Sequence, residues 1–193
     1  MEKGLFERAV AYAAEKHSGA YRKLDNSPYI LHPMEVALIV SSMTKDEEVL
    51  AAAVLHDTVE DTDATIEEIE ALFGPRTAAL VASETEDKHP ELPKAVSWRM
   101  RKEESIRKLK NASDPGVKLI WIGDKLSNLR ALKRAVGSMG GSVWGRFNQK
   151  DPAQHEWYYR SIEALLGELS GSEAWKEYHG LIESLFSAPK DER

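Results

Sequence analysis

The chain has 193 residues, of which 42% are hydrophobic and 30% are charged, a composition typical of a single globular domain. Its formal net charge of -6 argues against a nucleic-acid coat protein or a polybasic membrane binder, but allows a local basic pocket for a small anion. The lack of cysteine excludes disulfides, thiolate metal sites and cysteine nucleophiles. We expect a cytoplasmic protein, because the N-terminus lacks a signal-peptide core and no stretch approaches the roughly 20 apolar residues of a membrane span.

The first half of the chain has helical periodicity. Residues 3–17 place apolar side chains on one stripe, and a second helix is expected to begin near Pro33, because proline suits a first helical turn. Residues 46–61 are apolar nearly all round, which predicts a central, buried helix. Thr65 fits the start of a capping box, and Gly74 followed by proline predicts the end of one helix and the start of another.

The second half is helical as well. A charged, proline-containing loop is expected over residues 84–93, and a glycine-rich irregular segment over residues 137–147. Further helices are predicted over residues 94–110, 117–136, 152–168 and 172–187. The chain shows no alternating strand pattern, internal repeat or low-complexity segment. We therefore predict an all-α fold, in which residues 1–193 form one compact helical bundle.

A His-Asp pair follows the apolar segment AAAVL. His56 and Asp57 are adjacent, about 100° apart on a helix, so both side chains can reach one ion. Such a dipeptide is common by chance, and an ordinary surface pair is the alternative. However, His56 continues the apolar face of Val49, Ala52 and Ala53, which predicts a buried imidazole that needs a partner.

A second polar residue interrupts a core-facing stripe. In VKLIWIGDKLSNLRAL, Asp124 shares a helical face with Val117, Ile120 and Asn128. A buried carboxylate is costly unless a cation neutralises it. From spacing alone, a side-chain cation and a metal ion remain equally open as the partner of Asp124.

His32 precedes a proline at a predicted helix start, where a histidine can simply cap the helix. Two imidazoles and two carboxylates are nevertheless available together: His32, His56, Asp57 and Asp124. Such a nitrogen and oxygen set suits Mn²⁺, Fe²⁺, Zn²⁺ or Ni²⁺ better than a structural zinc site. Open positions on that ion would hold water and activate it for hydrolysis.

The ordered motifs HP, HD and D-x-x-x-N resemble the HD superfamily of metal-dependent phosphohydrolases. The segments YILHPMEVALIV, AAAVLHDTVEDTDATIEEIEALFG and VKLIWIGDKLSNLRAL are similar to the hydrolase domain of RelA/SpoT-type enzymes. The resemblance covers about residues 3–165, and the C-terminal helices extend to about residue 187. It implies a stand-alone small alarmone hydrolase that uses metal-activated water to cleave the 3′-pyrophosphate of ppGpp or pppGpp, giving GDP or GTP and pyrophosphate.

The resemblance also implies the metal ligands and the catalytic acids. Four positions match the family's ligands of one divalent ion, usually Mn²⁺: His32, His56, Asp57 and Asp124. Glu60 and Asp61 match its catalytic acidic pair. Because Glu60 lies one helical turn beyond His56, it can orient or deprotonate a water, while Asp61 can protonate a leaving oxygen. The alternative for both acids is a solvated helix end, although acids suit a helix C-terminus poorly.

Four positions are expected to bind substrate. Arg22 and Lys23 match a basic pair that packs on the purine and contacts phosphate, and Asn128 matches a residue that holds the ribose. Tyr158 is expected either to complete the pocket or to be an ordinary core aromatic. The predicted partner is a small nucleotide rather than a nucleic acid or a membrane, and the sequence does not indicate an oligomeric state.

Two features of the chain leave the substrate open. The helix expected over residues 94–110 carries seven lysines and arginines, of which Arg99 and Lys102 are the first expected to face a phosphorylated substrate, although an exposed charged helix is an equal alternative. Gly123 replaces the usual alanine of the family at a cost in helix stability. A phosphatase for another nucleotide, such as the 2′-phosphate of NADPH, is therefore the second hypothesis. A non-catalytic nucleotide sensor is the third, and the intact ligand and acidic positions argue against it.

Overall fold

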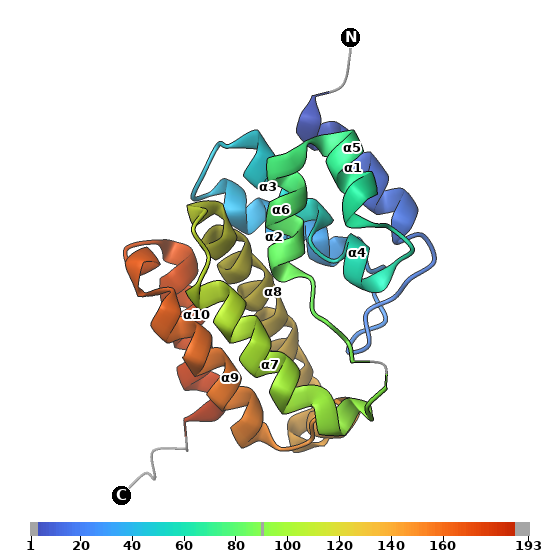
Figure 1. Ribbon diagram of the computed structural model, residues 1–193. Coiled ribbons are helices and arrows are strands. Elements are labelled where there is room, and N and C mark those ends of the chain that lie inside the picture. Colours follow the sequence, from blue (N-terminus) through green and yellow to red (C-terminus); the bar gives the residue numbers. More distant parts are fainter. Residues whose placement is uncertain (1–3, 90, 188–193) are drawn as a thin grey trace, which may run out of the picture.

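In the computed structural model, which describes residues 4–89 and 91–187, the chain folds into a bundle of helices (Figure 1). The helices are α1 (Leu5–Lys16), α2 (Leu31–Ser41), α3 (Glu47–Leu55), α4 (Thr58–Asp61), α5 (Ile66–Phe73), α6 (Pro75–Glu84), α7 (Lys94–Lys110), α8 (Pro115–Met139), the 3₁₀ helix η1 (Gly140–Arg146), α9 (Pro152–Leu165), the 3₁₀ helix η2 (Gly167–Leu169) and α10 (Glu173–Phe186). Across the described residues no β-strand forms, and the all-α prediction is confirmed. No described helix combines the length and hydropathy needed to cross a membrane.

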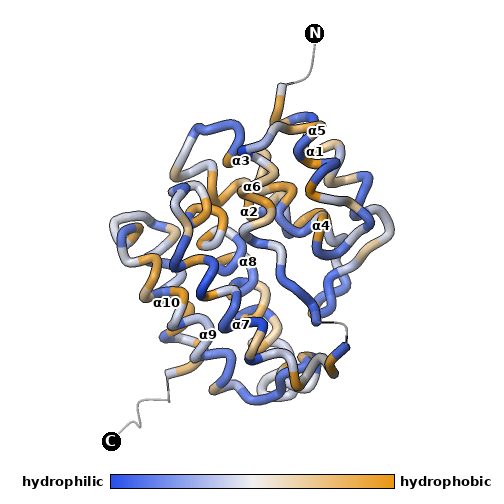
Figure 2. The backbone as a smooth tube through the Cα atoms, viewed as in Figure 1, coloured by the Kyte–Doolittle hydropathy of each residue, from blue (hydrophilic) through white to orange (hydrophobic). Residues whose placement is uncertain are grey.

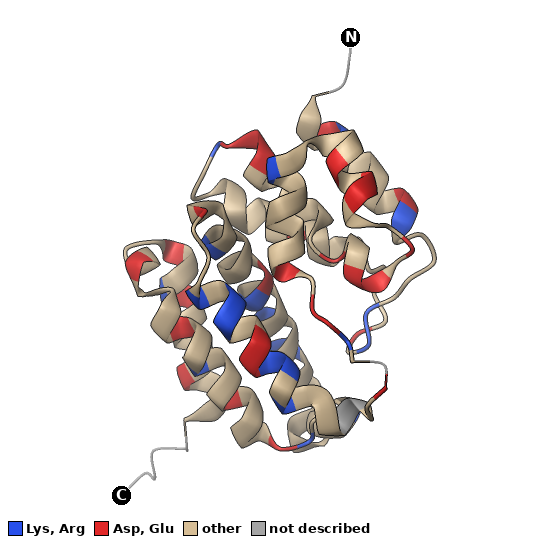
Figure 3. Cartoon of the chain, in the orientation of Figure 1, with Lys and Arg blue, Asp and Glu red and all other residues tan. Residues whose placement is uncertain are grey.

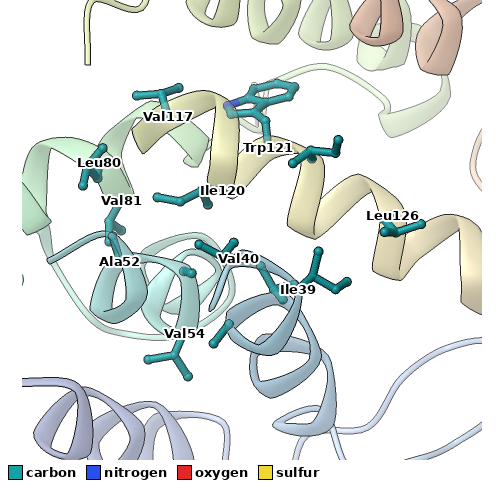
Figure 4. Close-up of a cluster of buried hydrophobic side chains, with 14 of the residues drawn as sticks. Ile39, Val40, Ala52, Val54, Leu80, Val81, Val117, Ile120, Trp121 and Leu126 are labelled. Carbon is teal, nitrogen blue, oxygen red and sulfur yellow. The ribbon is translucent and has the colours of Figure 1, made fainter. Parts of the chain in front are cut away.

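The hydrophobic core lies where α2, α3, α6 and α8 meet. Figure 4 shows Val40, Ala52, Leu80 and Ile120 gathered from these four helices, and all four side chains are buried. Residues 51–55 of α3 are inaccessible to solvent on every side, as the apolar pattern predicts. Figure 2 shows that hydrophobic residues concentrate in these central helices, whereas α7 is largely hydrophilic.

Helix α8 has neighbours on two sides (Figure 1). On one side it packs against α2, α3 and α6, and α1 covers α3. On the other side it packs against α10 and η1, while α9 lies between α10 and α7. A continuous cluster of buried apolar side chains extends from α1 to α10 through both sides. This continuity supports our proposal that the chain forms one domain.

The predicted helix boundaries hold where the local signals are strong. The Thr65 hydroxyl accepts a hydrogen bond from a backbone N–H in the first turn of α5. Gly74, with φ +92°, ends α5, and the following proline begins α6. However, α8 continues three residues past the expected end, to Met139, because the chain leaves the helix only at Gly140, which has φ +56°. The glycine-rich segment that follows is therefore not irregular throughout and forms η1.

Helices α2 and α8 approach each other closely at Gly123. A Cβ atom on this residue would lie 2.9 Å from Val40 Cγ2 and 3.1 Å from Val36 Cγ1, closer than packed carbon atoms normally lie. The glycine therefore allows a close helix contact that offsets its cost in helix propensity. This contact brings the next residue, Asp124, beside the start of α2.

Candidate active site

The His-Asp pair lies in a turn between two helices. The continuous helix predicted over residues 46–61 is wrong here, because α3 ends at Leu55 and α4 begins at Thr58. The Thr58 hydroxyl donates a hydrogen bond to the Leu55 carbonyl at 2.6 Å and so satisfies the end of α3. With φ -94° and ψ -5°, Asp57 departs from ideal helical values. Its carboxylate Oδ2 lies 3.1 Å from His56 Nε2.

The four predicted metal ligands converge from three parts of the chain. His32 comes from the first turn of α2, the His-Asp pair from the turn after α3, and Asp124 from the middle of α8. His32 Nε2 lies 3.1 Å from Asp124 Oδ1 and 3.5 Å from Asp57 Oδ2. One ligand atom from each of His32, His56 and Asp124 lies within 4.8 Å of the others. These three residues are also buried, with at most 5% of their surface exposed.

The hydrogen bonds of His56 leave one ring nitrogen available as a ligand. Its Nδ1 lies 2.9 Å from the carbonyl oxygen of Ala53, which can only accept, so Nδ1 carries the proton. In the neutral ring Nε2 then presents a lone pair, and this atom is buried without a hydrogen-bond partner. A buried polar atom in this state is costly unless something binds it. The orphaned Nε2, pointing toward two carboxylates, is what a divalent cation requires.

The surrounding charges also favour a cation. Burial lowers the pKa of His56, but the Asp57 and Asp124 carboxylates outweigh it and raise that pKa to about 10, so without a metal ion Nε2 holds a proton that a metal ion would displace. Burial opposes ionisation of Asp124, but Lys125 and the two histidines hold its pKa well below the usual range. The carboxylates therefore stay ionised and attract positive charge between the imidazoles.

Asp124 has two kinds of partner, one for each oxygen. Oδ2 contacts the Lys125 ammonium, whereas Oδ1 faces His32 and accepts a hydrogen bond from Asn128 Nδ2 at 2.5 Å. Lys125 Nζ also lies 4.5 Å from the centre of the Trp121 ring. The two alternatives for Asp124, a side-chain cation and a metal site, are thus compatible. Sequence reasoning missed Lys125, although its position directly after Asp124 was a usable signal.

Glu60 and Asp61 lie at the end of α4, beside the ligand cluster. Glu60 Oε2 accepts a hydrogen bond from the backbone N–H of Glu86 at 3.2 Å. Burial is the main cause that raises the pKa of Glu60 to about 7, and the charges of Asp57, Asp61 and Glu86 add to it. A carboxyl group with a pKa near neutrality can exchange a proton at physiological pH.

Asp61 is held by two donors. Lys88 Nζ donates to Asp61 Oδ1 at 2.8 Å, and the Tyr29 hydroxyl lies 2.9 Å from Asp61 Oδ2. The same hydroxyl lies 2.6 Å from Asp57 Oδ2, so its single proton is shared between a predicted metal ligand and a predicted catalytic acid. Burial and these carboxylates raise the pKa of Tyr29 above its usual range, and the hydroxyl stays protonated. Sequence reasoning missed both Tyr29 and Lys88, because neither stands in a distinctive local pattern.

Two adjoining cavities open onto these residues. The larger has a volume of about 510 Å³, and aromatic side chains form much of its wall: Trp98, Phe147, His155, Tyr158 and Tyr159. The smaller, of about 180 Å³, is lined almost entirely by polar groups of the ligand cluster and its surroundings: His32, Asp57, Glu60, Glu84 and Asp124. Several residues line both cavities and mark their junction: Arg22, Tyr29, Asp61, Lys102, Lys125, Asn128 and Tyr158. A ligand can therefore lie in the larger cavity and reach the ligand cluster with one end.

The predicted substrate residues lie along this path. Arg22 Nη2 donates to Asn128 Oδ1 at 3.0 Å, so these two residues meet at the junction. Lys23 lines the larger cavity but not the smaller one. Tyr158 is both a core residue, with 6% of its surface exposed, and part of the wall of each cavity, so its two predicted roles coincide.

Of the two α7 residues predicted to face a phosphorylated substrate, Arg99 and Lys102, only Lys102 lines the cavities. Figure 3 shows Lys and Arg along α7, and Asp and Glu on α4 and in the segment between α6 and α7. Lys102 lines both cavities, pairs with Glu86 at 3.1 Å and lies 4.9 Å from the centre of the Tyr158 ring. Arg99 instead pairs with Glu103 and packs 3.2 Å from the centre of the Trp157 ring, which is the role of an ordinary surface charge.

The family model described as HD domain matches residues 9–151. The chain belongs to the HD-domain family. This match includes every predicted metal ligand and both predicted catalytic acids, and it confirms the resemblance seen in the sequence. The helices α9 and α10 lie beyond the matched segment, which ends one residue before α9.

Several HD-domain relatives have assigned activities. The chain is 44% identical to human guanosine-3′,5′-bis(diphosphate) 3′-pyrophosphohydrolase MESH1 over 162 residues, which covers 82% of the chain and 83% of the human protein. It is 41% identical to GTP pyrophosphokinase rsh of Brucella abortus over 134 residues, but spans only 17% of that protein's length. The solved structure of a metazoan ortholog of SpoT that hydrolyzes ppGpp superposes with a TM-score of 0.76, at 31% identity over 95% of this chain and 97% of the other. A structure from Listeria monocytogenes EGD-e has a TM-score of 0.70 at 35% identity, covering 81% of this chain and 99% of that one.

Proposed function

We propose that this protein is a Mn²⁺-dependent hydrolase that removes the 3′-pyrophosphate of ppGpp or pppGpp. The observation that carries the proposal is the buried cluster of two imidazoles and the Asp124 carboxylate, with the Asp57 carboxylate beside it, where a polar cavity meets a nucleotide-sized aromatic one. The activity named for MESH1, which aligns along most of its length, supports the choice of substrate. Cleavage would yield pyrophosphate and GDP or GTP.

Four residues would hold the metal: His32, His56, Asp57 and Asp124. Nitrogen and carboxylate ligands without sulfur suit Mn²⁺. When bound, the ion supplies Lewis-acid activation of water and neutralises charge on the phosphoryl oxygens. The buried Nε2 of His56, which has no hydrogen-bond partner, supports this assignment, because a metal ion would bind its lone pair.

Glu60 is the group that would take a proton from the attacking water. Its carboxyl lies in the wall of the polar cavity, and its pKa of about 7 allows it to accept and release a proton near neutrality. The backbone N–H of Glu86 fixes one of its oxygens. Both oxygens of Asp61 accept hydrogen bonds, from Tyr29 and Lys88, so Asp61 would first have to take up a proton before it could deliver one to the leaving oxygen.

The substrate would extend through both cavities. The aromatic wall of the larger cavity and the planar guanidinium of Arg22 suit a purine base. Lys102 and Lys125 come from different helices and meet at the junction, where they would pair with phosphates. Although the formal net charge of the protein is -6, the basic side chains that line the larger cavity outnumber the acidic ones, so this cavity suits an anion.

The test is a panel of nucleotides assayed with purified protein, with and without Mn²⁺. We expect Mn²⁺-dependent release of pyrophosphate from ppGpp. Release of orthophosphate from NADPH, with no reaction on ppGpp, would replace the proposal with the second hypothesis. Binding of ppGpp without turnover of any nucleotide would favour a sensor.

A further inference from the structure

A hydrogen-bonded relay lies behind the predicted metal ligand His32. On the side of the ring away from the carboxylates, His32 Nδ1 lies 2.8 Å from Ser127 Oγ. Ser127 Oγ in turn donates to Glu35 Oε2 at 2.7 Å. Ser127 is on α8, one turn beyond Asp124, and Glu35 is on α2, one turn beyond His32. The relay therefore joins the same two helices that bring these ligands together.

The donors and acceptors of the relay determine which atom carries each proton. Burial raises the pKa of Glu35, but hydrogen bonds from Ser127 and Arg130 outweigh it and hold the pKa below its usual range. The ionised carboxylate can only accept, so the single Ser127 proton points to Glu35. The hydroxyl oxygen must then accept from His32, which places the ring proton on Nδ1. His32 Nε2 is left with its lone pair facing Asp124, in the same tautomer as His56.

Glu35 is held in place from the outer side. Arg130 Nη1 donates to Glu35 Oε1 at 3.0 Å. The other edge of the Arg130 guanidinium forms a two-pronged pair with Glu177 of α10, at 2.7 and 2.6 Å. Helix α10 lies outside the segment matched by the HD-domain model. A helix beyond that segment is thus connected to the predicted metal site.

We propose that Ser127 and Glu35 are positioning residues that hold His32 in the metal-binding tautomer and so set the affinity for the metal. Second-layer partners of metal-bound histidines generally act in this way, and their loss costs about 10–100-fold in metal affinity. Ser127 is 1% exposed. If its hydroxyl served only packing, removing that hydroxyl in Ser127→Ala would not weaken metal binding. The proposal rests on the metal site of the proposed function and not on the identity of the nucleotide.

The test measures the dissociation constant of Mn²⁺ alone for the full chain, by electron paramagnetic resonance of the free ion. Ser127→Ala should raise it by about 10–100-fold. Glu35→Gln should also raise it, because a neutral amide is a weaker acceptor for the Ser127 proton. Ser138→Ala is the matched control: it is the same substitution on α8, at a hydroxyl that bonds to the Ala135 carbonyl. It should leave Mn²⁺ binding unchanged.

A double-mutant cycle separates a relay from two independent packing effects. Once Ser127 has been replaced by alanine, Glu35→Gln should cause little additional loss of Mn²⁺ affinity, because the two residues act through one hydrogen-bonded chain. Wild-type affinity in folded Ser127→Ala, or fully additive losses in the double variant, would overturn the proposal. If Ser127→Ala does not fold, Glu35→Gln alone decides, and wild-type affinity in that variant overturns it. Because these measurements contain no nucleotide, failure of the proposed hydrolysis would leave their outcome unaffected.

Discussion

Arg22 and Asn128 are 106 positions apart in the chain, yet Arg22 Nη2 donates a 3.0 Å hydrogen bond to Asn128 Oδ1 at the junction of the two cavities. Asn128 Nδ2 in turn donates to the predicted metal ligand Asp124. Two predicted substrate residues are therefore pre-positioned by each other and by the ligand cluster. Because Arg22 bonds to Asn128, and Asn128 bonds to the ligand, a change at Arg22 can test substrate binding separately from metal binding.

Replacing Arg22 should affect substrate binding selectively. Arg22→Ala removes a charged donor and a planar surface from the junction, and losing one charged hydrogen bond costs about 1.5–3 kcal/mol. The KM for ppGpp should therefore rise by about 10–100-fold, while the Mn²⁺ dissociation constant stays within twofold. Steady-state kinetics and a Mn²⁺ titration provide the two values. A loss of Mn²⁺ binding equal to the rise in KM would mean that Arg22 supports the metal ligands instead.

Replacing Glu60 should affect turnover selectively. Glu60→Gln keeps the side-chain volume and the acceptor for the Glu86 N–H but cannot take up a proton, so kcat should fall by about 10²–10⁴-fold. Mn²⁺ binding should persist, because Glu60 is not among the predicted ligands. Glu70→Gln, at an exposed position of α5, is the matched control and should retain wild-type kcat. Full activity of Glu60→Gln would remove Glu60 from the mechanism.

The pH dependence of kcat should reflect the ionisation of Glu60. A base must be deprotonated to act, so activity should increase with pH through the pKa of Glu60, which burial and neighbouring carboxylates raise to about 7. A cation at Asp57 lowers this pKa, so the midpoint of the metal-loaded enzyme should lie at or below about 7. Glu86→Gln removes one of the like charges and should shift the midpoint to lower pH. If the pH dependence of kcat is unchanged in Glu86→Gln, the loss of activity at low pH is caused by the ionisation of another group.

Mn²⁺ should stabilise the fold through the ligand cluster. A ligand present at 100 times its dissociation constant adds about 2.7 kcal/mol to the free energy of unfolding. For a chain of this length that corresponds to an increase in Tm of about 5–10 °C. Asp124→Ala should abolish this increase, and a chelator should reverse it in the wild type. An equal increase in Asp124→Ala would place the binding site elsewhere.

Gly123→Ala should weaken the contact between α2 and α8. The added methyl would lie 2.9 Å from Val40 Cγ2, and overpacking of this kind costs about 1–3 kcal/mol, partly offset by about 1 kcal/mol of helix propensity. The free energy of unfolding should fall by up to about 2 kcal/mol in a denaturant titration. Gly137→Ala, also on α8 and with open space around the added atom, should be neutral or stabilising. A stabilised Gly123→Ala variant would show that the two valines can move aside.

The sequence by itself determined the fold class and the metal-ligand candidates. Its apolar stripes are helical throughout, and a polar residue on such a stripe must have a partner because an unpaired buried charge is costly. This reasoning identified His56 and Asp124, and both are buried as expected. The motif order then added His32 and Asp57 to the same site.

Only the tertiary structure decided what surrounds those ligands. Helical periodicity reports which face of a helix is buried, but not which other helix faces it. Ser127 and Glu35 are 92 positions apart, and Tyr29 and Asp57 are 28 apart, so their hydrogen bonds appear only after α2, α8 and the His-Asp turn have packed together. The break at Asp57 was also hidden from the sequence, because the apolar pattern continues up to the turn and the hydrogen bond of Thr58 to the Leu55 carbonyl forms only in the folded backbone.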